Sequence, residues 1–542
     1  MFHIVCTFIC SITEFIIFSN SVKNFFFCFN ITEEKMSNLN QSDKIKKIIE
    51  THVKKYNSAR YRLRTEDSDK SKPYRKITFG ERDKDKPHKT ILMVGETGTG
   101  KTKLINMVIN YMLGVKREDK VWFEITDDQS SRTQVHSQTS SVTVYEFNPQ
   151  ESLIHLTIID TPGYGDTRGV EKDQEITEGL LMLSKSADEI HEIDAVCLVI
   201  KSTQNRLSDR QIYIFDAVQS LFGRDIAENI VLLFTHSTGA HPRNALTAVK
   251  EAKIKCAVKD KNQPVYFLFN NCQADTDDEE DDEDTEEHEQ RLGLSWNRSF
   301  KGMEGLFKIL ETMKPKSLKM TRDVLQKRKQ LQAKISNLTE RVKMMETNKN
   351  KLKHTQEALE QNKKCVKENK NFEIVSEVPD REMVDIDRSV ASMALCCTEC
   401  KENCHYPGCW WASNVKWCSM IEDDHCTVCT KKCHYSKHVK AAKIYVSKTK
   451  KEKTTLEDLK KQYDSKITDG ETLAKKLEEE LQELEEEKKM LLDEAFDCVV
   501  NLQKIALKTD SVSTFQHIDF LIEKLMEINE FEKAKTLENM KK

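Results

Sequence analysis

The residues best suited to chemistry lie in a glycine-rich stretch, 95–102, which reads Gly-Glu-Thr-Gly-Thr-Gly-Lys-Thr. It follows the apolar run 91–94 directly and leads into a helical pattern over 104–113. Glycines at this spacing let backbone N–H groups surround a β-phosphate, and the helix start adds the positive end of its dipole. Lys101 should reach the β- and γ-phosphate oxygens, and Thr102 should ligate Mg²⁺. We expect a nucleoside triphosphate to contact Gly95, Glu96, Thr97, Gly98, Thr99, Gly100, Lys101, Thr102 and Lys103.

A second phosphate-site element ends the apolar run 153–159. Asp160 can hold the magnesium ion, usually through water, and the N–H of Gly163 can sense the γ-phosphate. An Asp followed three residues later by Gly, downstream of a glycine-rich phosphate-binding loop (P-loop) such as 95–102, is typical of switch proteins rather than of P-loop kinases. In the polar stretch between the two elements, we expect Thr139 to supply a further Mg²⁺ ligand, with Thr143 as the alternative. We assign the catalytic roles to Lys101, Thr139, Asp160 and Gly163.

The residue after Gly163 often positions the attacking water in such sites, and here it is Tyr164 rather than glutamine. The chain therefore has no obvious side chain for this task at the usual position. We expect slow, Mg²⁺-dependent hydrolysis of the bound triphosphate.

Cysteines form the second chemical cluster, because nine of the seventeen fall between Cys396 and Cys433. Two similarly spaced units begin at Cys397 and Cys426, and each Cys-x2-Cys pair can clasp a tetrahedral ion from one turn. The alternatives are a reactive thiol cluster or a disulfide-linked hook, and Cys396, Cys418 and His425 compete as ligands. We expect about two structural zinc ions per chain. The predicted ligands are Cys397, Cys400, Cys404, Cys409, Cys426, Cys429, Cys433 and His438.

The elements that must position these residues form an α/β fold. Short β-branched runs alternate with helix-length segments, which predicts a parallel-rich sheet with helices on both faces, the three-layer fold of P-loop proteins. The acidic run 275–289 carries twelve carboxylates and no Lys or Arg, and we interpret it as a solvated insertion before a last helix at 296–313. The expected strands are 91–94, 142–147, 153–159, 195–200, 230–234 and 265–269.

Beyond Lys314 the apolar spacing changes to alternating steps of four and three, which is typical of a coiled-coil seam. We expect the two arms to pair antiparallel as a helical hairpin with the cysteines at its tip; pairing between two chains is the alternative. The first seam comprises Leu331, Ile335, Leu338, Val342, Met345 and Leu352; the second comprises Leu456, Leu459, Tyr463, Leu473, Leu477, Leu484 and Leu491.

These patterns divide the chain of 542 residues into several units. We predict an apolar N-terminal segment (1–36), a polar leader (37–88), a P-loop domain (89–314), a coiled coil (315–372), a zinc module (390–440), a second coiled coil (450–508) and a C-terminal helix (509–542). We interpret the residues before Met36 as an extension ahead of the true start, since they lack the features of a signal peptide.

The distribution of charge along the chain limits the classes of partner that the protein is expected to bind. The net charge is −4, and without the twelve insertion carboxylates the rest of the chain sums to +8, spread out rather than gathered into a basic face. We therefore expect no nucleic-acid binding. Membrane association has no support beyond residues 1–31, and we expect a cytoplasmic protein.

Several of these residues resemble the immunity-associated (GIMAP-like) branch of septin-related GTPases over about 90–313. The resemblance rests on Gly95–Thr102, Asp160–Gly163 with Asp166-Thr167, Phe222-Gly223 and Phe234–His236; farther on, Ser137–Thr139, Lys316–Leu318 and Cys404–Pro407 resemble poorly characterised proteins that join such a domain to a coiled, cysteine-rich tail. It implies guanine-nucleotide binding and dimerisation through the G domain; the coiled-coil seams offer the coiled coil as a second place for a homodimer contact. It also implies that Thr235, His236, Asn270 and Asn271 hold the base.

One departure concerns base selection. Guanine is normally selected by an aspartate, but the stretch 235–238 reads Thr-His-Ser-Thr and carries no carboxylate. GTP is preferred over ATP mainly because of the resemblance. We expect a GTP-binding switch or scaffold with an unidentified protein partner; the alternatives are an ATP-binding P-loop protein, a P-loop phosphotransferase, or a structural coiled-coil zinc protein with a vestigial nucleotide site.

Overall fold

The computed structural model describes most of the chain from residue 45 to residue 541. The gaps are residues 47, 51–52, 56–59, 68–73, 127–140, 151, 165–169, 186–189, 204–208, 260–262, 272–284, 362–372, 389–390, 409–411, 413, 456, 459–469 and 509–511. The predictions for residues 1–36 lie outside these residues. Two compact units can be distinguished, one comprising residues up to Thr65 with Asn106–Asp127, and the other Glu66–Ile105 with Asp128–Lys542.

The first unit contains a three-stranded sheet in the order β1-β2-β6. Asn110 of α3 extends this sheet's hydrogen bonding, because its side chain donates to the carbonyl of Phe123 (2.8 Å) and accepts from the same residue's N–H (2.9 Å). Ile45 and Ile48 are buried, so part of the predicted polar leader is packed. The elements are β1 (Val53–Lys55), β2 (Arg60–Leu63), β6 (Trp122–Glu124) and the part of α3 (Lys101–Met112) from Asn106 onward.

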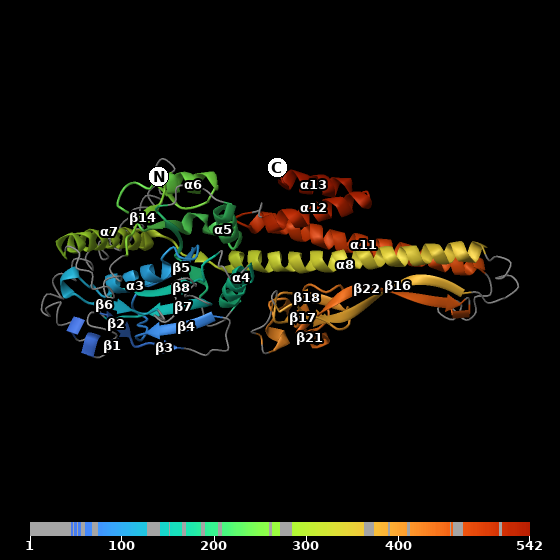
Figure 1. Cartoon of the computed structure of the whole chain (residues 1–542), viewed down its shortest axis with the longest axis horizontal. Coiled ribbons are helices and arrows are strands. Elements are labelled where there is room, and N and C mark those ends of the chain that lie inside the picture. Colours follow the sequence, from blue (N-terminus) through green and yellow to red (C-terminus); the bar gives the residue numbers. More distant parts are fainter. Residues whose placement is uncertain are drawn as a thin grey trace, which may run out of the picture. The chain divides into compact units, whose positions relative to one another are not determined.

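The second unit is built on an eight-stranded sheet in the order β14-β11-β10-β5-β8-β7-β4-β3 (Figure 1). Neighbouring strands are parallel except for the pairs β7–β8 and β3–β4. Each of the six predicted apolar runs forms a strand, and the predicted P-loop α/β fold is confirmed. The strands are β3 (Glu66–Asp67), β4 (Tyr74–Phe79), β5 (His88–Gly95), β7 (Val142–Phe147), β8 (His155–Asp160), β10 (Ala195–Lys201), β11 (Ile230–Thr235) and β14 (Tyr266–Leu268).

Strand β4 corrects the predicted leader over 37–88. It pairs with β7 in parallel, from Tyr74 opposite Val142 to Phe79 opposite Phe147, and Ile77 between them is also buried. The apolar residues are spaced among Lys and Arg, so the stretch has the composition of a surface segment although Tyr74, Ile77 and Phe79 are buried. The sheet therefore begins upstream of the predicted boundary at residue 89.

Helices cover the sheet, and three of them, α4, α5 and α6, share one hydrophobic core with alternate residues of β5, β8, β10 and β11. Helix α7 packs against β14, where a Cβ added at Gly302 or Gly305 would lie 2.6–2.7 Å from β14 or the adjoining Phe269. Residues 285–289 of the predicted insertion begin α7, which corrects that prediction; carboxylates are favourable in the first turn of a helix. The bounds are α4 (Val170–Lys185), α5 (Asp209–Ser220), α6 (Arg243–Glu251) and α7 (Thr285–Thr312).

Four short strands form two small antiparallel ladders beside these elements, β9 with β15 and β12 with β13. They are β9 (Glu192–Ile193), β12 (Val258–Lys259), β13 (Gln263–Pro264) and β15 (Lys316–Ser317).

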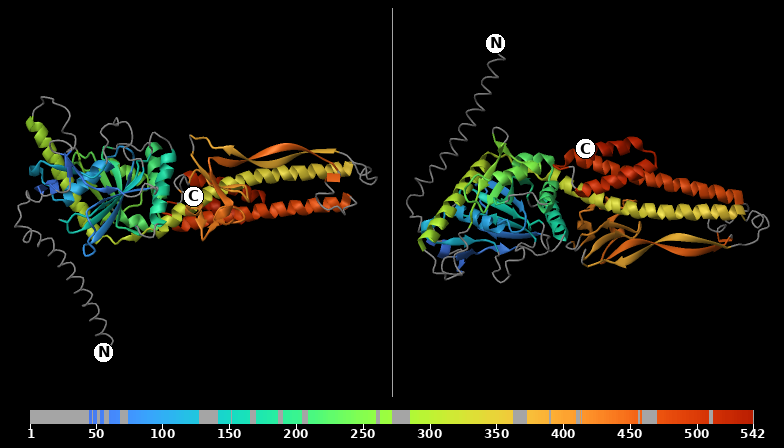
Figure 2. Two further views of the ribbon diagram at one scale, coloured as in Figure 1. Left: turned by 90° about the horizontal axis from the view of Figure 1, so that it is seen from below. Right: turned by 45° about the horizontal axis from the view of Figure 1, so that its top comes forward.

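Two long helices, α8 (Lys319–Gln361) and α11 (Gly470–Ile505), lie side by side and antiparallel within one chain (Figures 1 and 2). Their direction follows from ion pairs in reversed order, since Lys334 meets Glu494 whereas Lys349 meets Glu485. Residues 509–542, predicted as one helix, contain α12 (Val512–Glu527) and α13 (Phe531–Lys541), because Asn529 adopts a left-handed conformation (φ 60°) that ends α12.

The buried residues of the two arms agree with the first predicted seam more than with the second. All six predicted α8 residues are buried, and four of them belong to the core that includes α11, but α11 contributes a seam farther along the chain. Leu484 and Leu491 are only half-buried, whereas the other predicted side chains of this arm lie outside the described residues. The α11 seam comprises Leu492, Ala495, Val499 and Leu502, and Ala506 continues it just beyond the helix.

The cysteine module does not lie at the tip of the hairpin, which corrects that prediction. A long antiparallel ribbon of β16 (Glu373–Asp385) and β22 (Lys443–Thr455) runs back along α8 and brings the module beside the part of α8 nearer the sheet (Figure 2). Residues 450–455 thus belong to a strand and not to the second coiled coil. The module contains β17 (Ala394–Cys397), β18 (Glu402–His405), β19 (Ile421–Glu422), β20 (His425–Cys426) and β21 (His438–Ala441).

Among the helices that the structure describes, none is both long enough and apolar enough to cross a membrane.

Candidate functional site

The predicted phosphate loop connects β5 to α3, and its glycines adopt conformations that other residues rarely reach. Gly95, Gly98 and Gly100 have φ values of 154°, 77° and 86°. Thr99 fixes the turn by donating from Oγ1 to the carbonyl of Glu96 at 2.9 Å. This backbone can therefore direct several N–H groups toward one anion.

Lys101 lies at the start of α3 and folds over this loop. Its Nζ donates to the carbonyls of Gly95 and Glu96, each at 3.1 Å. Burial lowers the pKa of Lys101 to about 8, against the opposing effect of Asp160 and Glu96. The ammonium is thus held at the phosphate loop in an environment that penalises its charge.

The Asp160–Tyr164 segment is joined directly to this loop. Tyr164 donates its N–H to the Gly95 carbonyl (3.1 Å) and accepts from the N–H of Thr97 (3.2 Å). A Cβ at Gly163 would lie 2.4 Å from Thr97, so only glycine allows this approach. The structure therefore brings the two predicted phosphate elements together, with Asp160 buried at the end of β8.

The Tyr164 side chain is 1% exposed and belongs to the core beneath the sheet, with Val142 and Ile159. It does not face solvent at the phosphate loop. Asp166 and Thr167, and the predicted magnesium ligand Thr139, lie outside the described residues. The alternative ligand Thr143 is buried on β7 directly opposite Asp160.

The residues expected to hold the base lie at the ends of β11 and β14. Thr235 donates from Oγ1 to the carbonyl of Thr99 at 2.6 Å, which ties this element to the phosphate loop. His236 has a left-handed backbone (φ 53°), and its ring lies 3.7 Å from the position of a Cβ on Gly100. These contacts place the Thr-His pair beside the loop.

Asn270 and Asn271 follow β14 and are held by two serines of α7. The side-chain amide of Asn270 donates to the Ser295 hydroxyl (2.9 Å), and the side-chain oxygen of Asn271 accepts from the Ser299 hydroxyl (2.8 Å). The Asn271 amide nitrogen is buried with no hydrogen-bond partner among the described residues. This amide is thus free to donate to a ligand.

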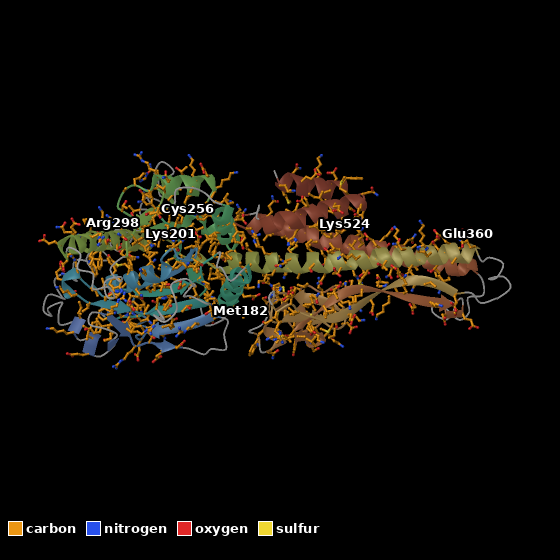
Figure 3. All side chains as sticks on the ribbon, in the orientation of Figure 1. Met182, Lys201, Cys256, Arg298, Glu360 and Lys524 are labelled. Carbon is orange, nitrogen blue, oxygen red and sulfur yellow. The ribbon has the colours of Figure 1, made fainter. Side chains whose placement is uncertain are left out.

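Two basic residues of this region were not singled out from the sequence, and Figure 3 labels both. Lys201 ends β10, with its Nζ 3.8 Å from the position of a Cβ on Gly98. Arg298 of α7 donates to the carbonyl of Ser237 at 2.6 Å. Lys201 could have been suspected, because ligands of parallel sheets bind at the carboxyl ends of the strands.

Seven of the eight predicted zinc ligands come together in the cysteine module; the eighth, Cys409, lies outside the described residues. They form two groups that share Cys429, and in each group all ligand atoms lie within 4.8 Å of one another. One group is Cys397, Cys400, Cys429 and Cys433, and the other is Cys404, Cys426, Cys429 and His438.

The two groups combine ligands from both sequence repeats, instead of one site per repeat. Cys397 and Cys400 of the first repeat join Cys429 and Cys433 of the second. Sequence spacing singled out the residues that gather here but not their grouping, because strand β17 pairs with β21 and brings distant turns together.

Crowding of the sulfur atoms is reflected in their pKa values. Hydrogen bonds that the Cys404 thiol donates to Cys426 and Cys429 raise the pKa of Cys404 well above its usual value. Hydrogen bonds from Cys397 and Cys404 lower the pKa of Cys429 to about 4. A set of neighbouring thiols that includes stabilised thiolates fits a divalent cation.

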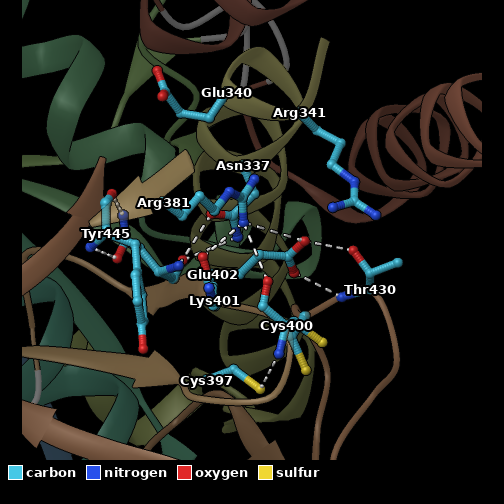
Figure 4. A network of polar contacts seen from close by, with 12 residues as sticks. Asn337, Glu340, Arg341, Arg381, Cys397, Cys400, Lys401, Glu402, Thr430 and Tyr445 are labelled. Atoms are coloured by element: carbon cyan, nitrogen blue, oxygen red, sulfur yellow. Dashed lines mark hydrogen bonds and ion pairs between the residues drawn. The ribbon is translucent and has the colours of Figure 1, made fainter. Parts of the chain in front are cut away.

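A buried polar network holds the two cysteine turns together (Figure 4). The Glu402 carboxylate accepts from the N–H (2.8 Å) and the hydroxyl (2.6 Å) of Thr430. Arg381 of β16 donates to the carbonyl of Lys401 (2.7 Å), and Asn337 of α8 donates to that of Asn403 (3.0 Å). The ribbon and α8 therefore brace the module.

Helix α4, which follows the Asp160–Gly163 element, contacts this module. Glu178 of α4 is 4% exposed and forms an ion pair with Lys329 of α8, and the Nε2 atom of His405 lies 2.8 Å from the same carboxylate. His405 contacts Cys418 through its other ring nitrogen (3.2 Å). No motif in the sequence pointed to Glu178 or Lys329, since a single Glu on a polar helix carries no signal.

Comparisons with known proteins bear on the P-loop domain. The AIG1 family model matches residues 89–287. Solved structures of Toc33 from Arabidopsis thaliana are similar: one, with Mg²⁺ and GMPPNP, shares 15% identity, covers 43% of this chain and 88% of its own, and has a TM-score of 0.28. A dimerisation-deficient Toc33 mutant shares 17% identity, with 35% and 72% covered and a TM-score of 0.23. The comparison with curated proteins gives no match.

The family match covers the strand, the phosphate loop, the Asp160–Gly163 element and the Thr-His pair in one continuous stretch. Residues 89–287 of this chain are therefore similar to the AIG1 family, and they carry the P-loop α/β fold described above.

Proposed function

We propose that this protein is a GTP-binding switch whose nucleotide state acts through α4 on the cysteine module. The observation that carries the proposal is the path from the phosphate loop to Glu178. The loop is hydrogen-bonded to Gly163 and Tyr164, α4 begins at Val170, and Glu178 of that helix pairs with α8 and with the module.

Phosphate binding is assigned to the loop 95–103, with Lys101 on the β- and γ-oxygens. Thr102 and Asp160 hold Mg²⁺, and Thr139 completes its ligands in the triphosphate state. The support is the conformation of the loop glycines and the buried Asp160 near Lys101. Residues whose contacts depend on the γ-phosphate are the ones that reorder between nucleotide states.

Base recognition is assigned to Thr235, His236, Asn270 and Asn271. The buried Asn271 amide suits a carbonyl acceptor such as the guanine O6, whereas adenine presents an amino group at that position. Competition of GTP and ATP against a fluorescent nucleotide tests this. We expect GTP to compete better in the native protein, and Asn271→Ala to reduce that preference. Equal competition would support the ATP-binding alternative instead.

Hydrolysis is proposed to be slow, because Tyr164 is buried in the core and cannot orient a water molecule. Phosphate release from purified protein at low concentration measures the intrinsic rate. Fast turnover that disappears in Lys101→Ala would contradict slow hydrolysis while still supporting the assigned site.

The coupling step predicts a specific defect in Glu178→Gln. Nucleotide affinity should be unchanged, since Glu178 does not belong to the phosphate site. The difference in hydrogen exchange of residues 394–441 between the GDP and GTP-analogue forms should be lost. Glu251→Gln, an exposed position on α6, is the matched control and should retain that difference. An unchanged difference in both variants would contradict the proposed path.

The cysteine module is proposed to hold structural zinc, with the packed thiol groups as support. Metal analysis of reduced, folded protein should find zinc, and its absence would contradict this assignment.

We further propose dimerisation through the G domain in a cytoplasmic protein with a protein partner at the module. Light scattering with GDP and with a GTP analogue tests the dimer; a monomer in both states would contradict it.

A further inference from the structure

We infer that the seven described ligands hold two zinc ions as one binuclear cluster, with the Cys429 thiolate bridging the metals. The inference rests on the zinc content proposed above and specifies how that zinc is bound. It replaces two separate sites, each with four ligands of its own, by a single site that both repeats must complete.

The ligand count carries the first step. Structural zinc takes four ligands in a closed tetrahedron, so two separate ions need eight. The described residues supply two groups of four that have Cys429 in common, and therefore seven residues in all. Seven ligands close two tetrahedra when one thiolate is shared. Cys409 is then not required as a ligand.

Distances between the ligand atoms fit this geometry. A Zn–S bond of about 2.3 Å in a tetrahedron places neighbouring sulfurs about 3.8 Å apart. The sulfurs of Cys400 and Cys433 lie 3.7 Å apart. These two residues come from different repeats, so the distance reflects the tertiary fold and not a local turn.

The backbone stabilises thiolates at the cluster. Cys429 Sγ accepts from the N–H of Cys433 at 3.2 Å, and Cys397 Sγ accepts from the N–H of Cys400 at 3.4 Å. Cys426 Sγ accepts from the N–H groups of Val428 and Cys429, both at 3.4 Å. Such N–H groups favour the charged form of the sulfur, which is the form that binds metal.

The histidine ligand is oriented in the same way. His438 Nδ1 donates to the carbonyl of His434 at 3.2 Å, which leaves the lone pair on Nε2. Nε2 is buried and makes no hydrogen bond to the described residues. Metal-binding histidines commonly donate their second ring N–H to a backbone carbonyl, which fixes the ring toward the metal.

The three residues that could compete as zinc ligands, Cys396, Cys418 and His425, make polar contacts with other groups. The Cys396 thiol donates toward the side-chain oxygen of Asn403 (3.3 Å) and the carbonyl of Lys443 (3.5 Å). Cys418 contacts His405, and the exposed His425 bonds to the carbonyl of Asp423. None of the three belongs to either group of ligand atoms.

Sharing Cys429 also reduces the buried charge. Six thiolates and two Zn²⁺ ions sum to −2, whereas two separate sites, one with four thiolates and one with three thiolates and a histidine, would sum to −3. The largely buried Arg381 donates to the carbonyl of Cys400 and so brings one positive charge to the cluster. A bridged cluster therefore leaves less negative charge for its surroundings to balance.

Cadmium substitution of the full-length protein tests the bridge without a mutation. ¹¹³Cd NMR should give two resonances, one for an all-sulfur site and one for a site with a nitrogen ligand. The two should be coupled to each other through the shared sulfur. Two uncoupled resonances would overturn the bridge while leaving the zinc proposal intact, and no bound cadmium or zinc would contradict the zinc proposal itself.

Mass measurement of the intact native protein provides the second test. Cys409→Ser should retain two zinc ions, as the wild type does, whereas Cys429→Ser should lose at least one. If Cys409→Ser loses an ion and Cys429→Ser loses only one, the chain has two separate sites and the inference is wrong. If Cys429→Ser does not fold, the cadmium spectrum of the wild type still decides.

Discussion

At the scale of single residues, the phosphate loop places a buried cation where a ligand's negative charge would lie. Lys101 donates to two loop carbonyls, and burial lowers its pKa to about 8 from the usual 10.5. A bound phosphate would favour the protonated form and raise that pKa again. Nucleotide binding should therefore be coupled to protonation of Lys101.

This coupling predicts that nucleotide affinity falls as the pH rises above about 8, by up to tenfold per pH unit. The free protein loses the Lys101 proton there, and binding must restore it. Fluorescence titration with a GTP analogue between pH 7 and pH 9.5 measures the slope. Lys101→Arg should remove the pH dependence, because a guanidinium stays charged throughout. A flat profile in the native protein would show that Lys101 remains charged.

The same pKa shift affects stability with a definite sign. Between about pH 8 and 10.5 the unfolded chain holds the Lys101 proton and the folded chain does not. The contribution of Lys101 to the free energy of unfolding therefore rises with pH in that window.

Glu402 acts at the residue scale by joining the two cysteine turns. It is 3% exposed and accepts two hydrogen bonds from Thr430. Glu402→Ala should leave these donors unsatisfied and destabilise the protein by about 2 kcal/mol. Zinc should also transfer faster to a chelator, measured by absorbance. Glu399→Ala, an exposed position in the same turn, is the control and should behave like the wild type.

At the scale of elements, sequence patterns predicted which segments form strands and which cysteines gather, but not which segments pair with one another. The runs 91–94 and 195–200 are apolar without interruption, so their burial could be predicted. Strand β4 and the ribbon could not, because their charged residues are typical of surface segments and their pairing partners are distant in sequence. At the site, the phosphate loop follows from spacing alone, whereas Glu178 and Arg381 acquire their roles only through tertiary contacts.

The α11 seam provides a test with adjacent leucines. Leu492 is fully buried against α8, whereas Leu491, which the sequence favoured, is half-buried. Leu492→Ala should lower the free energy of unfolding by about 3 kcal/mol. Leu491→Ala should cost clearly less, as measured by urea denaturation. Equal losses at the two positions would contradict the observed register of the helix pair.

At the scale of the whole second unit, the eight-stranded sheet shares buried contacts with the helical tail, which begins with α8 and includes α11. Leu318, Leu325 and Leu507 belong to the same core as the sheet, and Leu507 donates its N–H to the Phe222 carbonyl at 2.9 Å. Nucleotide-dependent changes in the sheet edge and in the tail should therefore be energetically linked rather than independent.

Lys329 offers a test of this linkage. Lys329→Met should leave the buried Glu178 with His405 as its remaining partner and destabilise the protein by about 3 kcal/mol. Calorimetry should show one main transition for the sheet and tail of the wild type, and a separation into two for the variant. Lys343→Met, an exposed position on α8, is the control. A single unshifted transition in Lys329→Met would argue against the linkage.

The fold-back of the ribbon also bears on biosynthesis. Helix α8 ends at Gln361, whereas its partner α11 begins only at Gly470. At a translation rate of about 5–20 residues per second, α8 is therefore complete roughly 5–20 s before synthesis of α11 begins. The ribbon and the module, which contact α8, are synthesised within this interval. We expect metal acquisition by the nascent module to precede pairing of the helices, so zinc-starved cells should accumulate chains with an uncovered α8 that chaperones bind.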